Sequence, residues 1–524
     1  MASEPESKTS RRRERLEGLS PTKRALLLKA LQKEAMLAGG SEPIGKRPDR
    51  QTAPLSFAQE RLLFIEQLFP GTPAYNIPAA VRLEGPLQVA ALQQSFQQEV
   101  NRHEALRTTF RFVNGEPTQQ ISEAVAAPLP VIDLSDLPKA VRESVGTAVA
   151  VREAQQPFDL ERGPLVRLSL VRLSENDHIA LLTMHHIISD GWSIDLFIGE
   201  LVTLYEALTM EKSAPLPNLA IQYGDYAYWQ TERSQANLIA AQLDYWKQQL
   251  QGVTSLPKLV TDRPRPAMQT FHGSQHRLSF NPELLDQVEA LSRQAGTTTF
   301  IVLLAILKIL LHSIADHSDM VVGTPVNNRQ RVELEGVIGL FVNTLVLRTD
   351  LSGNPTFEQI LARVRAVVLA AHAHQDIPFE TVVKALQVER DMGQTPLFGV
   401  WFLYQVAPAP RPLSNLKVTG FPVDHGITHY DLRLNLLESV QGLNGTIEYN
   451  TDLFLPSTIF RLANRFEAFL RFCVNRPELT LAEVTRAVLE EEKARKVNQE
   501  NEQRQANLSR LQNVTRRAIA VTDI

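Results

Sequence analysis

The sequence predicts an α/β protein made of two large lobes, and three observations support this prediction. Between residues 54 and 484, strand-like and helix-like stretches alternate, which favours an α/β architecture. A proline-rich segment, residues 261–266, lies near the middle and separates two halves of similar size. The chain has 524 residues, 44% hydrophobic and 21% charged, so it can bury a large core, and whole-chain disorder is excluded.

Individual elements follow from the spacing of apolar residues. Residues 179–184 predict a strand, residues 282–295 a helix, and residues 319–325 a second strand that ends in a turn. The most apolar run, residues 300–311, is too short to cross a bilayer and contains Lys308, so we expect a buried helix there and no membrane span.

Charge and cysteine content exclude several classes of protein. With 54 Lys+Arg against 58 Asp+Glu, the chain has a formal charge of −4 and lacks the basic excess of a nucleic-acid-binding protein. The single cysteine, Cys473, excludes an intrachain disulfide and a cysteine-rich metal site. The N-terminus has no apolar core of the kind that a secretory signal needs, so we expect a cytoplasmic protein.

Both ends of the chain differ from the middle. Ser20 and Pro21 predict the start of a short helix that has one apolar face, and Gly39-Gly40 ends it. This helix is either a surface element of the main body or a small docking element. The last segment, residues 486–524, is rich in charged and amide residues and predicts either a solvated helix or a tail that needs a neighbour to order.

A cluster of polar residues follows the predicted strand at 179–184. His185 and His186 are adjacent, and after three residues come Asp190 and Gly191, an HHxxxDG pattern. An imidazole at the end of a strand, held in one tautomer, can accept or steer a proton from a nucleophile. Because successive side chains of a strand point to opposite faces, only one histidine can face a substrate. We predict that His186 does so and that His185 points inward, while Gly191 permits a tight turn.

Three other interpretations of the pattern compete with catalysis. Histidine and aspartate are metal ligands, but adjacent histidines converge poorly on one ion, and no HExxH motif or cysteine cluster supports a metal site. The histidines could instead be a hydrogen-bonded pair in the core. The loop could also belong to a protein that kept the fold and lost the activity.

The chain resembles the condensation domains of non-ribosomal peptide synthetases. The resemblance covers about residues 53–485 and includes seven stretches in the expected order. These stretches are residues 55–64, 102–110, 185–191, 223–229, 338–345, 374–380 and 390–398. Each is weak evidence alone, whereas the ordered set is specific.

The resemblance implies a fold with two chloramphenicol-acetyltransferase-like lobes that form a V around a central tunnel. It implies a docking or linker helix at 1–52, an N-terminal lobe at 53–230, a C-terminal lobe at 231–485 and a charged tail or linker at 486–524. His186 is then the central residue, as base or as positioner of the attacking amine. Asp190 is expected to be structural, paired with Arg102 or Arg107. Further tunnel or substrate residues are expected to be Trp192, Ser193 and Asn343.

The implied reaction joins a carrier-bound acyl or peptidyl thioester to an aminoacyl acceptor through an amide. The sequence contains no carrier, adenylation or GxSxG thioesterase pattern. We therefore expect no cofactor bound by this chain and 4′-phosphopantetheine delivered on donor and acceptor carrier proteins. Expected partners also include other synthetase modules. Residues 508–519 resemble linkers found near dioxygenase-like partners, which adds a dioxygenase-like tailoring enzyme.

Two alternatives of other classes remain. The chain could be an acyltransferase onto a free amine or alcohol, because HHxxxDG also occurs in acyl-CoA-dependent enzymes, although the DFGWG signature of the plant enzymes is absent. It could also be a non-catalytic module that recruits a carrier protein and a tailoring enzyme.

Overall fold

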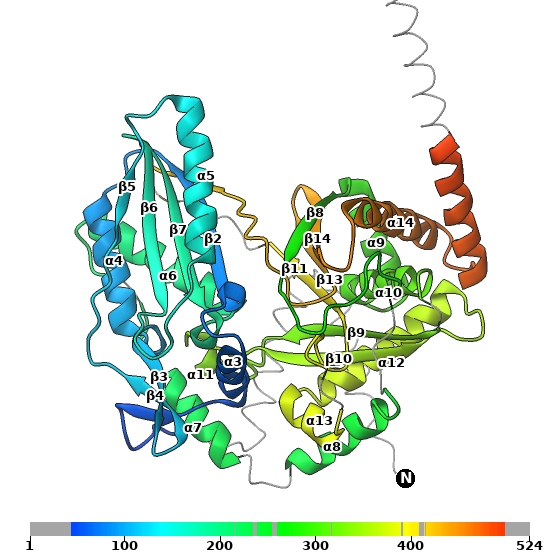
Figure 1. Ribbon diagram of the computed structural model, residues 1–524, viewed down its shortest axis with the longest axis horizontal. Helices are drawn as coiled ribbons and strands as arrows, with labels where there is room; N and C mark the ends of the chain where they lie inside the picture. The colour runs from blue at the N-terminus through cyan, green and yellow to red at the C-terminus, as the bar shows by residue number, and fades with distance from the viewer. Residues whose placement is uncertain are drawn as a thin grey trace, which may run out of the picture.

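Two β-sheets organise the chain, each covered by helices in its own lobe (Figure 1). The structure is a computed structural model that describes residues 43–497, apart from 215, 234–237, 254–258, 316, 389–390, 408–412 and 414. We call the lobe with the five-stranded sheet the N-lobe and the lobe with the six-stranded sheet the C-lobe. The helix expected at residues 20–38 lies outside the described residues.

The N-lobe sheet has the strand order β12-β2-β7-β6-β5. Its strands are β2 (Asn76–Glu84), β5 (Val131–Asp133), β6 (Val166–Ser174), β7 (Asp177–His185) and β12 (Lys417–Gly420). All neighbours are antiparallel except β5 and β6. A small sheet beside it contains β1 (Thr52–Pro54), β3 (Thr108–Val113) and β4 (Glu116–Ile121).

Helices cover both faces of the N-lobe sheet because its strands carry apolar side chains on both sides. Along β7, Ile179 and Leu181 pack in the core under α5, whereas Leu182 and Met184 pack in the core shared with α4 and α6. This alternation is the two-residue period of a strand. The N-lobe helices are α3 (Phe57–Leu68), α4 (Val89–Arg102), α5 (Lys139–Gln155), α6 (Gly191–Thr209) and α7 (Tyr223–Arg233).

The C-lobe sheet has the order β10-β9-β11-β13-β14-β8. Its strands are β8 (Gly273–Ser279), β9 (Asp319–Val326), β10 (Asn343–Asp350), β11 (Val400–Val406), β13 (Leu432–Ser439) and β14 (Gly442–Asn450). Its helices are α8 (Leu238–Gln249), α9 (Pro282–Gln294), α10 (Thr299–His312), α12 (Phe357–Ala373), α13 (Phe379–Ala385) and α14 (Pro456–Asn475). The strands predicted at 179–184 and 319–325 and the helix predicted at 282–295 are confirmed by β7, β9 and α9.

The apolar run at 300–311 forms α10, whose residues 301–311 are all buried in the C-lobe core, as predicted. Among the described residues, no single helix is both long enough and apolar enough to cross a membrane. The pair α9 and α10, which meet at 105°, reaches that length and composition only when the two helices are counted together.

Lys308 is a charged side chain in the middle of this core. Its Nζ donates to the carbonyl oxygen of Met320 in β9 at 3.0 Å and to that of Leu347 in β10 at 2.6 Å. Burial lowers the pKa of Lys308 to about 7, because the charged ammonium is disfavoured away from water. Lys308 therefore connects α10 to β9 and β10. The free-energy cost of burying this side chain depends on pH.

We expect this cost to appear in the pH dependence of stability. Between pH 7 and 10 the unfolded chain holds a proton on Lys308 that the folded chain releases, so folding becomes more favourable as pH rises. In a Lys308→Met variant this component is absent. Between pH 7 and pH 10, the free energy of unfolding of the wild type, measured relative to that of the variant, should therefore rise by on the order of 3 kcal/mol. Urea unfolding of both proteins at several pH values measures the difference, and parallel pH curves would contradict it.

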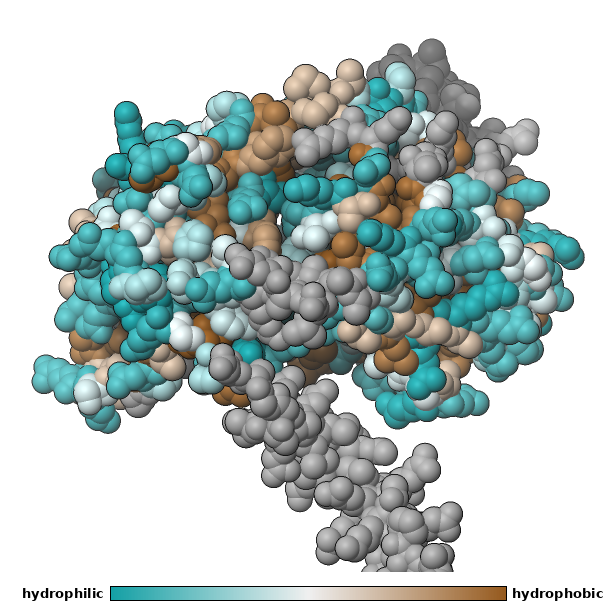
Figure 2. All heavy atoms as spheres, turned by 90° about the horizontal axis from the view of Figure 1, so that it is seen from below, coloured by the Kyte–Doolittle hydropathy of each residue, from teal (hydrophilic) through white to brown (hydrophobic). Residues whose placement is uncertain are grey.

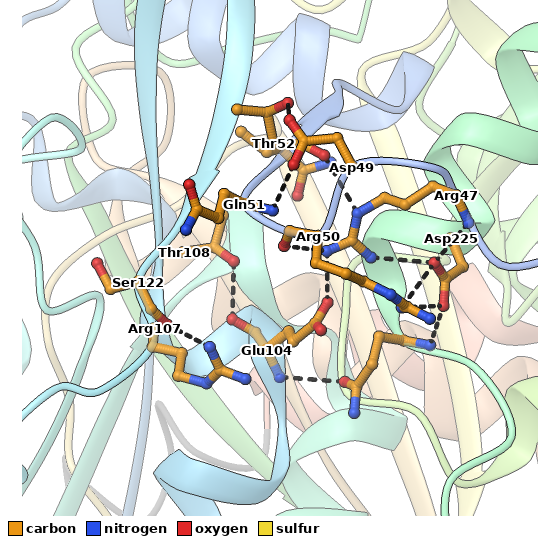
Figure 3. A network of polar contacts seen from close by, with 12 residues as sticks. Arg47, Asp49, Arg50, Gln51, Thr52, Glu104, Arg107, Thr108, Ser122 and Asp225 are labelled. Atoms are coloured by element: carbon orange, nitrogen blue, oxygen red, sulfur yellow. Dashed lines mark hydrogen bonds and ion pairs between the residues drawn. The ribbon is translucent and has the colours of Figure 1, made fainter.

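Residues 43–52 belong to the N-lobe and not to a linker, so the predicted boundary at residue 52 is wrong. Ile44 is buried in the N-lobe core. Arg47 is also buried, and its guanidinium contacts Asp225 of α7 at 3.0 Å and Glu104 at 2.8 Å (Figure 3). Arg50 contacts the same aspartate at 3.2 Å. The buried carboxylate of Asp225 requires these cations, so the segment that supplies them is part of the fold.

Two truncations should separate this segment from the residues before it. Removal of residues 1–42 should leave the free energy of unfolding nearly unchanged, because the sequence predicts only one short helix there and a short helix alone is marginal in water. Removal of residues 1–50 should lower it by about 3 kcal/mol, because Asp225 and Glu104 lose Arg47 and Arg50. Thermal and urea unfolding of the two proteins measure this contrast, and equal stability of both truncations would contradict it.

The predicted tail also begins too early. Residues 481–497 are helical, and Leu481, Val484 and Val488 are buried in the C-lobe core. Glu491 and Glu492 of this helix form ion pairs with arginines of α14. The C-lobe therefore extends beyond residue 485, and only residues 498–524 of the predicted tail lie outside the described residues.

Two segments of the second half of the chain pack in the N-lobe, which a linear division at residue 230 does not predict. Strand β12 pairs with β2, so the chain crosses from the C-lobe to the N-lobe sheet and back again (Figure 1). Residues 334–341, which include α11 (Val332–Glu335) in part, contribute five side chains to the N-lobe core. These two crossings connect the lobes, and the cavity described below is lined in part by residues 340–344 and 429–430, which adjoin them.

Candidate active site

A cavity of about 890 Å³ lies between the two lobes. Its walls come from α3 and the HHxxxDG loop of the N-lobe, and from β10, α13 and the segment before β13 of the C-lobe. Figure 2 shows the molecule from below, where hydrophobic patches interrupt a largely hydrophilic surface, several of them near the middle of the molecule. The volume of the cavity lies within the range of small-molecule binding sites.

The HHxxxDG loop connects β7 to α6. His185 is the last residue of β7, His186–Ile188 form a short 3₁₀ turn, and Asp190 caps the N-terminus of α6 by accepting from the backbone N–H of Ser193 at 2.8 Å. The change from strand to turn between the two histidines turns their side chains to different sides. Of the two, only His186 lines the cavity.

His185 lies in the N-lobe core. Its Nδ1 accepts from the backbone N–H of Ile187 at 3.1 Å, and its ring meets the edge of Phe158 at 6.0 Å. Burial, together with the neighbouring His186, lowers the pKa of His185 to about 3. It is therefore a neutral side chain that holds the loop, in the position predicted for it.

His186 faces the cavity in a defined tautomer. Its Nδ1 lies 2.8 Å from the carbonyl oxygen of Ser189, and because a carbonyl only accepts, Nδ1 carries the proton. Nε2 then has the free lone pair. Burial lowers the pKa of His186, an effect that the Ser189 carbonyl and Asp190 partly oppose. At neutral pH the side chain is an uncharged imidazole that can accept a proton at Nε2.

Asp190 pairs with Arg329, so the predicted partners Arg102 and Arg107 are wrong. Arg329 Nη2 lies 3.2 Å from Asp190 Oδ1, and both side chains are almost completely buried. The carboxylate also accepts from Ser193 Oγ at 2.7 Å and from the backbone N–H of Phe341 at 3.0 Å. Four donors therefore compensate its charge in the interior, as a buried carboxylate requires.

Helix geometry explains why the predicted arginines are elsewhere. Arg102 forms an ion pair with Glu200 at 2.8 Å. Glu200 lies ten residues after Asp190 on the same helix, which places it about 15 Å further along the axis. Arg107 donates to the carbonyl oxygen of Ser122, in the network shown in Figure 3. Both arginines stabilise the N-lobe away from the HHxxxDG loop.

The remaining predicted site residues have structural contacts. Trp192 is 40% exposed, donates to the carbonyl oxygen of Glu335 at 2.9 Å and does not line the cavity. Ser193 is buried, and its Oγ donates to Asp190 and contacts Arg329 at 2.9 Å, so it is not a tunnel residue. Gly191 is the first residue of α6; a Cβ there would meet nothing within 4 Å and its φ is not positive, so the predicted need for glycine in a tight turn is not supported.

Asn343 does line the cavity, at the start of β10. Its Nδ2 donates to the carbonyl oxygens of Gln375 and Ile377 at 2.8 and 2.7 Å, and its Oδ1 accepts from the backbone N–H of Phe379 at 3.0 Å. These bonds join β10 to the start of α13. The side chain thus shapes the cavity wall, with its polar atoms already used by the protein.

Sequence reasoning missed several polar side chains of the cavity. Arg61 of α3 lies 3.5 Å from Glu380 of α13, an ion pair that spans the two lobes. Tyr75, His429 and Tyr430 also line the cavity. Arg61 lies in the family stretch at residues 55–64, but no sequence pattern indicated that its side chain lines the cavity. The other three lie outside every stretch, and only the fold brings them to His186.

A separate group of potential metal ligands lies in the N-lobe core between α4 and α6. Among the described residues, Glu99, His103 and Glu200 bring one ligand atom each within 4.8 Å of one another. Arg102 and His103 already contact Glu200, both at 2.8 Å. Burial, followed by the charge of Glu200, raises the pKa of Glu99 to about 9, so a proton neutralises it at pH 7.

A family model of the condensation domain matches residues 49–496. The chain belongs to the condensation-domain family. It is 43% identical over 444 residues to one of the proteins that make up the linear gramicidin synthase of Brevibacillus parabrevis, a match that covers 84% of this chain and 6% of that protein. This condensation domain therefore spans only a small part of that relative's length.

Solved structures agree with this family. The complex of the X-domain and OxyB from teicoplanin biosynthesis matches with a TM-score of 0.76 and 28% identity, covering 85% of this chain and 98% of that one. SgcC5 from Streptomyces globisporus, solved with a naphthyl ethanediol, matches with a TM-score of 0.70 and 26% identity, over 82% of this chain and all of that protein. The two-lobed, chloramphenicol-acetyltransferase-like fold is confirmed, and so is the resemblance to condensation domains.

Condensation domains of non-ribosomal peptide synthetases are acyltransferases that form amide bonds, so the prediction of an acyltransferase is confirmed at the level of the family. They act with phosphopantetheine bound to carrier proteins of the synthetase.

Proposed function

We propose that this condensation domain forms an amide between an acyl or peptidyl thioester and an aminoacyl acceptor, each carried on a phosphopantetheine arm of a partner carrier protein. The observation that carries the proposal is the fixed tautomer of His186. Its Nδ1 proton is engaged by the Ser189 carbonyl, so the lone pair of Nε2 is the one available to the cavity that the side chain lines.

The geometry supports a direct attack on the thioester. The acceptor amine adds to the thioester carbonyl carbon, forming a C–N bond, and the C–S bond then breaks. The proton lost by the nitrogen passes to Nε2 of His186 and then to the departing pantetheine sulfur, so the imidazole returns to its starting state. The low pKa of His186, caused first by burial, keeps Nε2 unprotonated before the amine binds.

The buried scaffold holds this imidazole in place. His185 fixes the start of the turn through Ile187, and Asp190 fixes its end through Arg329. The lone pair therefore keeps one direction without contributions from the substrates, which lowers the cost of orienting the reacting groups.

Two solved structures of related proteins each suggest an alternative function for this condensation domain. SgcC5 was solved with a naphthyl ethanediol, so a small free alcohol or amine is a candidate acceptor for this condensation domain as well. The X-domain was solved as a complex with OxyB, so recruitment of a tailoring enzyme, for which we expected a dioxygenase-like protein, is a second candidate role.

One experiment distinguishes these functions. The purified protein is mixed with carrier proteins loaded with octanoyl, N-acetylleucyl or N-acetylphenylalanyl groups. Acceptors are leucyl- or glycyl-loaded carriers, free leucine, or a small diol. Mass spectrometry of the products should show amides on the acceptor carrier. Products formed only with free leucine or the diol would favour transfer to a free acceptor. The absence of product with every donor and acceptor would exclude the proposed reaction for these substrates and favour the recruitment role.

A further inference from the structure

A second histidine of the cavity, His429, is used by no step described so far. It lies in the segment between β12 and β13, where the chain returns from the N-lobe sheet to the C-lobe. It lines the same cavity as His186, and each lies near enough to Arg61 for that cation to lower its pKa. The cavity that His186 lines thus carries a second imidazole, from a different segment of the chain.

The position of the His429 ring is fixed on several sides. The ring stacks on Tyr75 with centroids 4.8 Å apart and meets the edge of Phe271 at 5.9 Å. Its backbone carbonyl accepts from Gln269 Nε2 at 2.6 Å and from Thr395 Oγ1 at 3.3 Å. A side chain held by aromatic packing and by its own backbone can present one atom to a substrate without reorganisation.

His429 is an uncharged side chain. Burial, followed by the nearby charge of Arg433 and by His186, lowers its pKa to about 3. At neutral pH the imidazole therefore has one N–H and one lone pair, on different nitrogens.

The surroundings of the ring select which nitrogen carries the proton. Nδ1 of His429 is buried and has no hydrogen-bond partner among the described residues. A buried N–H without an acceptor is rarer in proteins than a buried acceptor without a donor. Because His429 lines the cavity and Nδ1 is its buried nitrogen, we assign the proton to Nε2, the other ring nitrogen. His186 has the opposite arrangement, because its Nδ1 carries the proton and Nε2 the lone pair.

We propose that His429 donates its Nε2–H to the thioester carbonyl oxygen while His186 accepts the proton of the attacking amine. The inference rests on the proposed function. Negative charge develops on that oxygen as the C–N bond forms, and a preorganised donor stabilises it more than mobile water would. The two imidazoles supply complementary groups, an acceptor for the nitrogen and a donor for the oxygen.

The tautomers can be tested without substrate. The protein is labelled with ¹⁵N-histidine, and long-range ¹H–¹⁵N spectra distinguish an Nε2–H from an Nδ1–H imidazole. His429→Phe and His186→Ala variants assign the two signals. We expect Nε2–H for His429 and Nδ1–H for His186 at pH 7. A protonated Nδ1 or a charged ring at His429 would overturn the proposal whether or not the protein turns over.

Kinetics test the role of the donor with the carrier pair that the wild type uses fastest. His429→Phe keeps the aromatic stack on Tyr75 and removes the N–H, and it should lower kcat about 10²–10³-fold with little change in KM. His429→Gln retains an amide N–H and should recover part of this loss. The matched control is His425→Phe in the same segment, which does not line the cavity and should leave kcat unchanged.

The outcomes separate the two proposals. Inactive wild-type protein would argue against the proposed function. The NMR measurement of the His429 tautomer would still test the proposed arrangement of the two imidazoles. Active wild type with an equally active His429→Phe would overturn the role of His429 alone. A rise in KM without a fall in kcat would also overturn it, because it would show a contact made equally in the ground state.

Discussion

His186→Ala should lower the rate of amide transfer by about 10²–10⁴-fold, the usual contribution of a positioned general base. The free energy of unfolding should change little, because the ring faces a cavity and its one hydrogen bond in the described structure goes to the Ser189 carbonyl. Single-turnover transfer between loaded carriers measures the rate, and urea unfolding measures the stability. Turnover near that of the wild type would remove His186 from this role.

The pH dependence provides a control for the same assignment. Burial lowers the pKa of His186, so the neutral imidazole persists below the ordinary histidine range, and the fall of kcat/KM on the acid side should lie below pH 6.5. His425→Ala, outside the cavity, should retain both the rate and the pH profile. An acid limb at or above the ordinary histidine pKa would argue that another group titrates in the rate profile.

The local structure around the histidines followed from the sequence because local rules determine it. A strand alternates its side chains, so a pair at its end separates into one inward and one outward residue. The structure places His185 and His186 in this way, although the outward residue already lies in the 3₁₀ turn. The elements at 179–184, 282–295 and 319–325 were predictable for the same reason, since hydrophobic periodicity acts within each element.

The partners of these residues were not predictable, because they come from distant parts of the chain. Arg329 lies 139 residues after Asp190, beyond the end of β9 in the other lobe. Arg102 was predicted as a partner of Asp190 because it lies in one of the family stretches. In the structure it forms its ion pair with Glu200 of α6 instead. Likewise, β12 and the buried Arg47 belong to the N-lobe through pairings that no periodicity within their own segments indicates.

Loss of the Asp190–Arg329 pair should destabilise the whole protein. Asp190→Ala leaves a guanidinium that is 1% exposed without its carboxylate, and Arg329→Met leaves a carboxylate that is 0% exposed without its cation. Each change should lower the free energy of unfolding by about 3–5 kcal/mol, the usual cost of breaking a buried ion pair from one side. Urea unfolding of each variant measures the loss.

The double variant and an exposed pair provide the controls. Because both single changes damage one contact, Asp190→Ala with Arg329→Met should cost less than the sum of the two. Asp133 and Arg172 form a pair at 3.1 Å on the surface, and Asp133→Ala should cost less than about 1 kcal/mol, since solvent screens exposed charges.

Arg329 also donates to the carbonyl oxygens of Leu334 and Val337, so it holds residues 334–341 against the N-lobe. The destabilised variants should therefore lose transfer activity as they lose their fold. An Asp190→Ala protein as stable as the wild type but inactive would instead place Asp190 in the chemistry.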